Sequence, residues 1–321
     1  MADVVCLRPR ADFEAVGITP PPELDIAYRA PEDDDVAELI RGARALVIPA
    51  VGPALPGDLF RGTALELVQV TGAGLDRLDR AVLAGEGIAL ANVPGGSNAA
   101  LAEYVVVNAL SLLRGFHGAG AALRAGDYAA HRKRMVDAVL RGLGGLVVGV
   151  VGIGTIGQAV AERCRQMGAE IAYFDPAPPD GAPGKRMDLD ALLAASDVVT
   201  LHLPLIDATR GLIDARRIGL MKPGAVLINA ARGGIVDEAA LAKALEEERL
   251  AGAAVDVYAT EPPGPDNPLL TLAGPAAQRL ILTPHIAGVS LQASQHLFRE
   301  AWDNVSSVLL GGAVPRNRVA A

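Results

Sequence analysis

The sequence predicts an α/β fold with two domains, each built on a parallel β-sheet. At 321 residues, the chain is about twice as long as a typical domain. From about Leu146 onward, short apolar runs alternate with helical stretches, a pattern typical of a parallel sheet with helices on both faces. The expected strands are Val147–Val151, Ile171–Phe174, Val198–Leu201, Ala225–Ile228, Ala253–Val257 and Leu280–Leu282.

The first hundred residues show a looser version of this alternation and predict a smaller α/β domain. A long apolar helix, Ala99–Leu113, follows the helix breakers at 94–98, which places a domain boundary near residue 97. The C-terminal helix, about Leu291–Leu310, has no sheet of its own, so we expect it to pack on the first domain. One domain would then be discontinuous, at 1–97 plus 289–321, with the other at 98–288. The early strands are expected at Val4–Leu7, Ala45–Ile48, Leu67–Val70 and Ile88–Leu90.

Composition narrows the class of partner. A formal net charge of -8 argues against nucleic acid and against a membrane surface, because both need a basic face. Cys6 and Cys164 can form neither a disulfide framework nor a zinc site, and the N-terminus lacks a signal-peptide core, so we expect a cytoplasmic protein without a metal. The uncharged stretch Gly142–Ala161 has the length of a membrane span, but seven of its residues are glycine, which favours a buried strand and a turn.

A glycine-rich motif predicts a dinucleotide site of the Rossmann type. Gly152, Gly154 and Gly157 follow an expected strand directly and open a helix. The first glycine makes a tight turn, the second lets the backbone approach a pyrophosphate, and the third lets helix and strand pack closely. The phosphates would then lie at the helix N-terminus.

Asp175 strengthens this prediction, because it ends the next strand, 18 residues after Gly157. A carboxylate there accepts hydrogen bonds from the adenosine ribose hydroxyls and repels a 2′-phosphate. Pro176 and Ala177 follow it rather than an arginine, so the sequence favours NAD over NADP as cofactor.

Three polar residues follow consecutive strands of the second domain: Arg232, Glu261 and His285. Ligands of open α/β sheets bind beyond the carboxyl ends of the strands, so we expect these side chains near the cofactor. Hydride transfer from an alcohol needs a base and a cation, which this set supplies, and Glu261 beside His285 would fix the imidazole tautomer. Taken singly, the three also suit a surface ion pair, a loop carboxylate and a core histidine.

The pair Gly72 and Gly74 also follows a strand, without completing a dinucleotide motif. It suits a simple turn, or a turn whose backbone N–H groups hold a small anion such as a carboxylate.

At these residues the sequence resembles the D-isomer-specific 2-hydroxyacid dehydrogenases. The matching segments are 151–158, 229–237, 254–258 with Glu261-Pro262, 283–288, 72–76 and 98–103, so that the resemblance covers nearly the whole chain.

The resemblance implies two Rossmann- or flavodoxin-like domains, of which 98–288 binds NAD and the discontinuous one binds substrate. It implies that His285 is the acid/base, that Glu261 is its partner, that Arg232 binds the substrate carboxylate, and that Ala73 and Gly74 hold substrate through their backbone. It also implies homodimers joined through the long helix after Asn98. The NAD contacts implied by motif and resemblance are Gly152, Gly154, Thr155, Ile156, Gly157, Asp175, Leu203, Ala230, Ala231, Arg232, Asp256, His285 and Gly288.

Departures from the family bear on substrate. Phosphoglycerate-type members often carry an arginine where this chain has Val70, and the formate branch has glutamine in place of Glu261. We therefore expect a small D-2-hydroxy acid or its 2-oxo acid, of the glyoxylate or hydroxypyruvate type. Since the sequence ends at Ala321, we expect no regulatory domain of the kind that some phosphoglycerate-type members append.

Two other functions stay open at this point. A corepressor-like binding protein that senses NAD would use the same fold and can retain the same three residues. Another Rossmann enzyme, such as an amino-acid dehydrogenase, would need a lysine base, which the sequence does not place.

Overall fold

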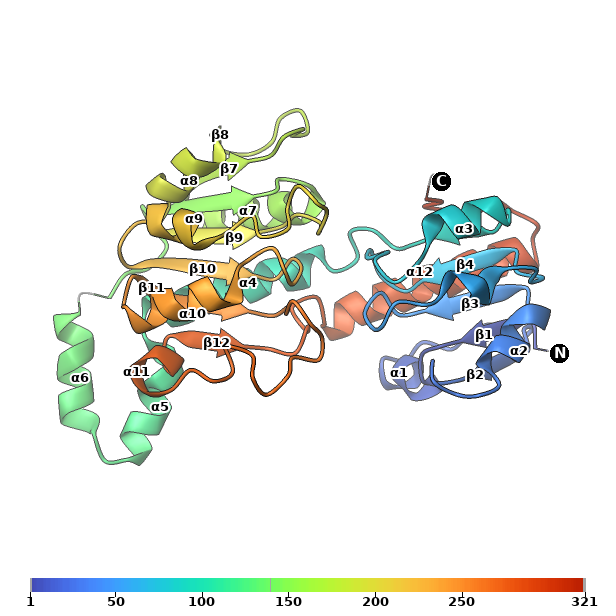
Figure 1. The fold of residues 1–321 in the computed structure, drawn as a ribbon, viewed down its shortest axis with the longest axis horizontal. Helices are drawn as coiled ribbons and strands as arrows, with labels where there is room; N and C mark the ends of the chain where they lie inside the picture. The colour runs from blue at the N-terminus through green and yellow to red at the C-terminus, as the bar shows by residue number, and fades with distance from the viewer. Residues whose placement is uncertain (1, 139, 320–321) are drawn as a thin grey trace. The chain divides into compact units, whose positions relative to one another are not determined.

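The computed structural model describes residues 2–138 and 140–319, which form two compact units. Unit 1 comprises 1–97 and 289–321, and unit 2 comprises 98–288. The prediction of an α/β fold with parallel sheets is confirmed, because every strand pair in both units is parallel (Figure 1).

Unit 1 is a five-stranded sheet in the order β2-β1-β3-β4-β5, the strand order of flavodoxin-like folds. Its C-terminal helix α12 packs on this sheet through Phe298 and Trp302, whose rings meet that of Phe13 at centroid distances of 4.8 and 5.4 Å. The elements are β1 (Val4–Cys6), α1 (Arg10–Ala15), β2 (Ile26–Tyr28), α2 (Val36–Gly42), β3 (Ala45–Ile48), η1 (Gly57–Phe60), β4 (Leu67–Val70), α3 (Arg80–Gly85), β5 (Ala89–Ala91) and α12 (Leu291–Leu309).

Unit 2 is a seven-stranded sheet in the order β12-β11-β10-β9-β6-β7-β8. The strands are β6 (Val147–Val151), β7 (Glu170–Phe174), β8 (Lys185–Arg186), β9 (Val198–Leu201), β10 (Ala225–Asn229), β11 (Leu250–Val255) and β12 (Leu280–Leu282). The helices are α4 (Asn98–Leu113), α5 (Phe116–Arg124), α6 (Tyr128–Asp137), α7 (Thr155–Gln166), α8 (Leu189–Ala195), α9 (Ala215–Leu220), α10 (Glu238–Glu246) and α11 (Gly274–Ala277).

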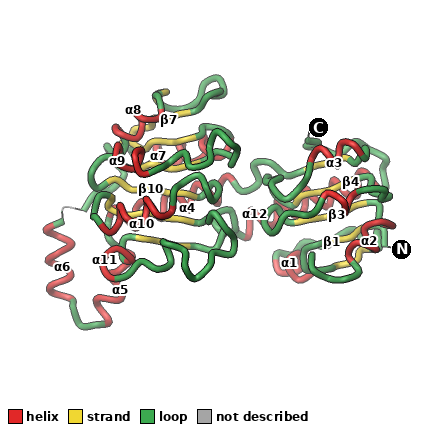
Figure 2. Tube along the Cα trace, viewed as in Figure 1, coloured by secondary structure: helices red, strands yellow, loops and turns green. Residues whose placement is uncertain are grey.

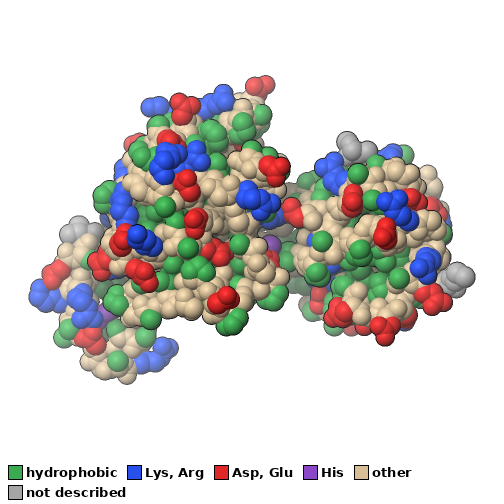
Figure 3. Space-filling model, viewed as in Figure 1, with side chains coloured by type: hydrophobic (Ala, Val, Ile, Leu, Met, Phe, Trp, Pro, Cys, Tyr) green, Lys and Arg blue, Asp and Glu red, His purple; other side chains and the backbone are tan. Residues whose placement is uncertain are grey.

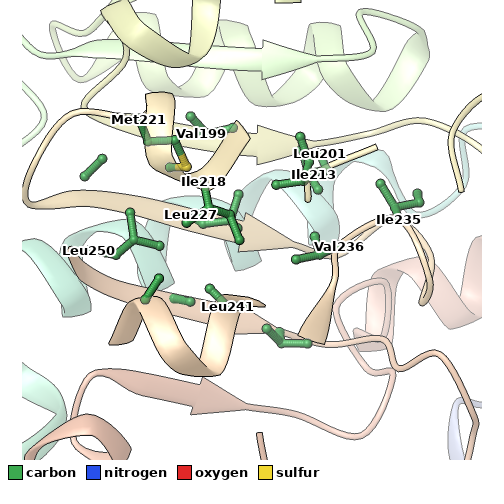
Figure 4. Packing of buried hydrophobic residues seen from close by; sticks show 14 of the residues in the cluster. Val199, Leu201, Ile213, Ile218, Met221, Leu227, Ile235, Val236, Leu241 and Leu250 are labelled. Atoms are coloured by element: carbon green, nitrogen blue, oxygen red, sulfur yellow. The ribbon is translucent and has the colours of Figure 1, made fainter. Parts of the chain in front are cut away.

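The central strands of this sheet, such as β6 and β10, are buried on both faces, and that burial is why they are mostly apolar. Val199 and Leu227 point into a cluster with helices α8, α9 and α10, shown close up in Figure 4. Their neighbours Val198 and Val226 point into a second cluster, with helices α4 and α7 on the opposite face. Alternate side chains of one strand therefore enter different cores, which fixes the register of the sheet.

The stretch Gly142–Ala161 is divided between a turn, strand β6 and the start of helix α7, and so agrees with the strand expected there. Among the described residues, no single helix has the length and hydropathy needed to cross a membrane. Only as a bent pair, with an angle of 50° between them, do Asn98–Leu113 and Gly118–Arg124 meet those criteria.

Figure 2 shows the strands in the middle of each unit, with loops extending from their ends. On the face seen in Figure 3, acidic and basic side chains are interspersed over each unit rather than gathered into one basic patch.

Asp197 ties three elements together at the amino end of the unit 2 sheet. Its carboxylate accepts hydrogen bonds from the Val147 amide at 3.0 Å, from Arg141 Nη1 at 3.2 Å and from Lys222 Nζ at 3.1 Å. Burial acts to raise the pKa of this carboxyl, but the Val147 amide and the Lys222 ammonium outweigh burial and lower it from the ordinary 3.8.

We expect Asp197→Asn to destabilise the protein by about 1–3 kcal/mol, since the variant loses charge-assisted hydrogen bonds at a nearly buried position. The measurement is the thermal unfolding midpoint followed by circular dichroism. Because the pKa is lowered in the folded state, this stabilisation is present above pH 3.8 and is lost as the pH falls through the folded value. The difference in unfolding midpoint between the wild type and Asp197→Asn should therefore become smaller in acid. Asp58→Asn is the control, since that side chain is 95% exposed and should change the midpoint little.

Candidate active site

The site residues predicted in unit 2 lie at the carboxyl edge of its sheet. Strand β6 lies between β9 and β7, so the chain runs outward in opposite directions from this point of the sheet. Open parallel sheets bind their ligands in the crevice beyond such a switch point. The loops after β6, β7, β9, β10, β11 and β12 all leave the sheet at this edge, and they carry the candidate residues discussed below.

The three glycines of the motif meet different surroundings. Gly152 has φ +90°, and a Cβ on it would lie 2.3 Å from the His202 carbonyl oxygen. A Cβ on Gly157 would lie 2.1 Å from the carbonyl oxygen of Gly152. A Cβ on Gly154, by contrast, would meet no atom within 4 Å. Packing therefore requires the first and third glycines, whereas the second faces open space at the N-terminus of α7, where a pyrophosphate group fits.

Asp175 is bound to the same loop. Its Oδ2 accepts a hydrogen bond from the Ile153 amide at 2.9 Å, and its Oδ1 accepts one from the Ala177 amide at 2.9 Å. The sequence places no arginine directly after Asp175, but β8 brings Arg186 alongside, and its Nη2 donates to the carbonyl oxygens of Asp175 and Pro176 at 3.2 and 3.4 Å. A carboxylate and a guanidinium group therefore share the corner expected to hold the adenosine ribose.

The remaining predicted NAD contacts stand at the same edge or in the first turn of α7. Leu203 follows β9, and its amide nitrogen lies near the turn at Gly152. Ala230 and Ala231 follow β10, and Gly288 ends the segment after β12. Thr155 and Ile156 are the first two residues of α7.

The turn that carries Arg232 is shaped by Asn229, the last residue of β10. The Asn229 side chain accepts a hydrogen bond from the Ala231 amide and donates one to the Arg232 carbonyl oxygen, both at 3.2 Å. Arg232 Nη1 donates to the Ala231 carbonyl oxygen at 2.7 Å. A Cβ on Gly233 would lie 1.7 Å from the Tyr258 carbonyl oxygen, so this turn packs directly on the segment after β11.

Glu261 and His285 meet as a pair. Glu261 Oε2 lies 2.8 Å from His285 Nδ1, and Oε1 accepts a hydrogen bond from the Tyr258 amide at 3.0 Å. The two side chains are about a third and a quarter exposed. A carboxylate accepts only, so Nδ1 carries a hydrogen and Nε2 is left as the atom that exchanges a proton with a ligand. This is the arrangement of a general acid/base with its orienting carboxylate.

Asp256 holds the segment that carries this histidine. Its buried carboxylate accepts hydrogen bonds from the Ile286 and Ala287 amides, both at 2.8 Å, and from the Thr283 hydroxyl at 2.5 Å. The family resemblance predicts an NAD contact at Asp256, whereas these hydrogen bonds were not predicted from the sequence.

Tyr104 of α4, on the sheet face opposite to helices α8, α9 and α10, contacts the same threonine, Thr283. Its hydroxyl lies 2.8 Å from the Thr283 hydroxyl, and burial raises the pKa of Tyr104 to about 12, so the phenol stays protonated. Neither Thr283 nor Tyr104 was singled out from the sequence as a site residue. The sequence signals were that Thr283 directly follows an expected strand and opens the family-like segment 283–288.

His202 follows β9 at the same edge but is a poor acid/base. One ring nitrogen lies 2.8 Å from Thr200 Oγ1, and burial lowers the pKa of His202 to about 3. It is therefore neutral at physiological pH.

Ala73 and Gly74 lie in unit 1, in the turn after β4. Asn92 Nδ2 donates to the Ala73 carbonyl oxygen at 2.8 Å, and the Val93 amide donates to the Gly72 carbonyl oxygen at 2.9 Å. These bonds occupy carbonyl oxygens of the turn. Ala73 itself is exposed.

Comparison with known proteins extends over the whole chain. Residues 106–287, more than half of the chain, match the family described as D-isomer specific 2-hydroxyacid dehydrogenase, NAD binding domain. The glycerate dehydrogenase of Methylorubrum extorquens is 35% identical over 289 residues, which cover 90% of this chain and 89% of that protein. The (S)-sulfolactate dehydrogenase of Chromohalobacter salexigens is 35% identical over 295 residues, covering 89% and 92% of the two chains. The solved structure of D-2-hydroxyisocaproate dehydrogenase superposes with a TM-score of 0.82 at 26% identity, covering 99% of each chain.

The residues present suit the NAD of this family. Open space over Gly154, the free amides at the start of α7 and the Asp175 carboxylate supply a phosphate cradle and a ribose acceptor. The resemblance found in the sequence is confirmed, and the protein belongs to the D-isomer specific 2-hydroxyacid dehydrogenases, as an NAD-dependent oxidoreductase.

Proposed function

We propose that the protein interconverts a small D-2-hydroxy acid and its 2-oxo acid, of the glyoxylate or hydroxypyruvate type. Unit 2 would be the NAD-binding domain and unit 1 the substrate domain. The observation that carries the proposal is the Glu261–His285 pair, at 2.8 Å, on the sheet edge that also carries the glycine motif. The glycerate dehydrogenase relative supports the choice of acid, because oxidation of glycerate at C2 gives hydroxypyruvate.

His285 is the proposed proton donor and acceptor. In the reduction, Nε2 gives its proton to the oxygen on C2, and in the oxidation the same atom takes the hydroxyl proton. NAD, when bound, supplies or accepts the hydride at C2. Glu261 holds the imidazole through Nδ1 and so fixes its tautomer.

Arg232 is the proposed partner of the substrate carboxylate. A guanidinium group binds a carboxylate through two parallel hydrogen bonds, which fixes the direction in which C2 faces. The backbone amides of Ala73 and Gly74 are proposed to donate to the same substrate. Held in this way, the carbonyl carbon is oriented before the reaction begins.

The first experiment follows absorbance at 340 nm with purified protein, NADH and a panel of 2-oxo acids that includes glyoxylate, hydroxypyruvate and pyruvate. We expect oxidation of NADH with one preferred acid. His285→Gln should lower kcat by about 10²–10⁴-fold, the usual contribution of a general acid/base, while the Kd for NADH stays near the wild-type value.

His131→Gln on α6 is the matched control and should leave turnover unchanged. Full activity of His285→Gln would remove this residue from the mechanism. Binding of NADH without turnover of any acid would instead favour a protein that senses NAD.

A second prediction concerns the cofactor cradle. Gly154→Val should fold, because residue 154 has an extended backbone that valine accepts and its Cβ meets no atom within 4 Å. It should nevertheless raise the Kd for NADH at least tenfold, since the side chain fills the space proposed for the pyrophosphate. The measurement is NADH fluorescence with a parallel melting curve. Normal NADH affinity in Gly154→Val would contradict the placement of the phosphates.

We further propose that the protein is cytoplasmic and has neither a nucleic-acid nor a membrane partner. Its two cysteines are free and buried, and burial raises the pKa of Cys6 to about 12 and that of Cys164 to about 11. Such thiols are unreactive and give no sign of an oxidising compartment.

A homodimer through unit 2 is the proposed assembly. Helix α6 buries none of the side chains described for it, and apolar side chains are exposed on α4, α5 and α6. Exposed apolar side chains on helices that contact one another are typical of a protein interface. The exposed residues of this α4–α6 face are Val107, Phe116, Leu123, Tyr128 and Val136.

The double variant Leu123→Glu with Val136→Glu should convert the dimer to a monomer, because two carboxylates would be buried without partners. Sedimentation equilibrium measures the mass. Leu310→Glu, at an exposed position outside this face, is the control and should remain dimeric. A wild-type protein that sediments as a monomer at micromolar concentration would contradict the proposal.

A further inference from the structure

An arginine that the catalytic proposal does not use is buried in unit 1. Arg77 is only 4% exposed and lies three residues after Gly74. Burial lowers the pKa of Arg77, yet a guanidinium group keeps its charge in a protein. Its guanidinium group donates hydrogen bonds to backbone carbonyl groups, so this buried cation binds the main chain.

The carbonyl groups all belong to the segment that follows β3. Arg77 Nε donates to Pro53 at 2.8 Å, while Nη1 donates to Pro49 at 2.9 Å and to Val51 at 3.3 Å. In return, the Leu55 amide donates to the Arg77 carbonyl oxygen at 2.8 Å. The segment 49–55 therefore wraps around one planar group, whose fixed fork suits several acceptors at once.

A glycine in the segment accommodates this arrangement. Gly52 has φ +134°, and a Cβ on it would lie 3.0 Å from Arg77 Cζ. Any side chain there would be strained by the backbone and would press on the guanidinium group.

The two loops joined by Arg77 leave neighbouring strands at the same edge of the unit 1 sheet. Strands β3 and β4 are paired in parallel, from Ala45 with Leu67 to Ile48 with Val70. Segment 49–55 therefore lies beside the turn at Gly72–Gly74, and a Cβ on Gly72 would be 2.8 Å from the Ala50 Cβ. At the tip of the segment, the Val51 side chain is 45% exposed.

We propose that Arg77 is a positioning residue that sets segment 49–55 against the Gly72–Gly74 turn and thereby limits the size of the substituent on C2. The inference rests on the proposed function, in which this turn donates to the substrate carboxylate. A carboxylate held by Ala73 and Gly74 leaves its substituent beside segment 49–55, where Val51 presents an apolar surface. The buried cation also makes this edge more favourable for an anion.

The experiment compares Arg77→Met, Arg77→Lys and Gly52→Ala with Arg61→Met, an exposed arginine of the same unit, as the control. For Arg77→Met we expect the KM of the preferred 2-oxo acid to rise about tenfold or more, with a smaller change in kcat and an unchanged Kd for NADH. The ratio of kcat/KM between glyoxylate and a bulkier 2-oxo acid should shift at least tenfold toward the bulkier acid. Arg77→Lys keeps the positive charge but lacks the planar guanidinium group, so its KM and its kcat/KM ratio should lie between those of the wild type and Arg77→Met. Gly52→Ala should shift the same kcat/KM ratio although Arg77 is intact.

Hydrogen exchange of the backbone amides of 50–52, 54 and 55 measures the loop without any turnover, and should be at least tenfold faster in Arg77→Met than in Arg61→Met. Unchanged exchange overturns the inference, because Arg77 would then not hold the segment. Faster exchange with an unchanged substrate ratio overturns its substrate part and leaves Arg77 as a purely structural residue. If the wild-type protein turns over no acid, both the proposed function and the proposed effect of Arg77 on substrate choice are wrong. If the wild type is active but hydrogen exchange is unchanged in Arg77→Met, only the inference about Arg77 is wrong.

Discussion

The buried carboxylate of Asp256 is the interaction on which the candidate site depends. A carboxylate that is 1% exposed would be very costly without donors, and here it receives three, all from the segment 283–287. Those bonds hold His285 at φ +54°, a left-handed conformation that few non-glycine residues adopt. Since the His285 amide also donates to the Asp256 carbonyl oxygen at 2.8 Å, one aspartate fixes both the backbone of the histidine and its neighbours. The backbone therefore already orients the His285 imidazole toward Glu261.

The central strands of unit 2 could be predicted closely because they are buried on both faces. In runs such as 147–151 and 198–201 only Thr200 is polar, and the observed β6 and β9 have the predicted bounds. Strands β2 and β8 were not predicted. Strand β2 is apolar but only three residues long and half-buried, and β8 is the exposed pair Lys185–Arg186, which contains no apolar residue. Edge strands are defined by pairing with a neighbour, which local sequence does not contain.

The candidate site, like the strands, could be predicted from the sequence only in part. Glu261 and His285 were expected to be partners because each follows a strand, and the structure brings them to 2.8 Å. Arg77 and Arg186 could not be foreseen, since their partners lie 24 to 28 and 10 to 11 residues away and depend on strand order. Charge patterning predicts exposed arginines, and only packing shows that one of them is buried.

The strand order has a consequence for the history of such an enzyme. Arg232, Glu261 and His285 all come from the ends of three adjacent strands, β10, β11 and β12, of a single unit. In the proposed division of roles, mutations in the loops of unit 1 alter the substrate contacts, whereas the Glu261–His285 pair and its hydrogen bonds lie entirely in unit 2. Paralogues with this division would change their preferred acid before they change their mechanism.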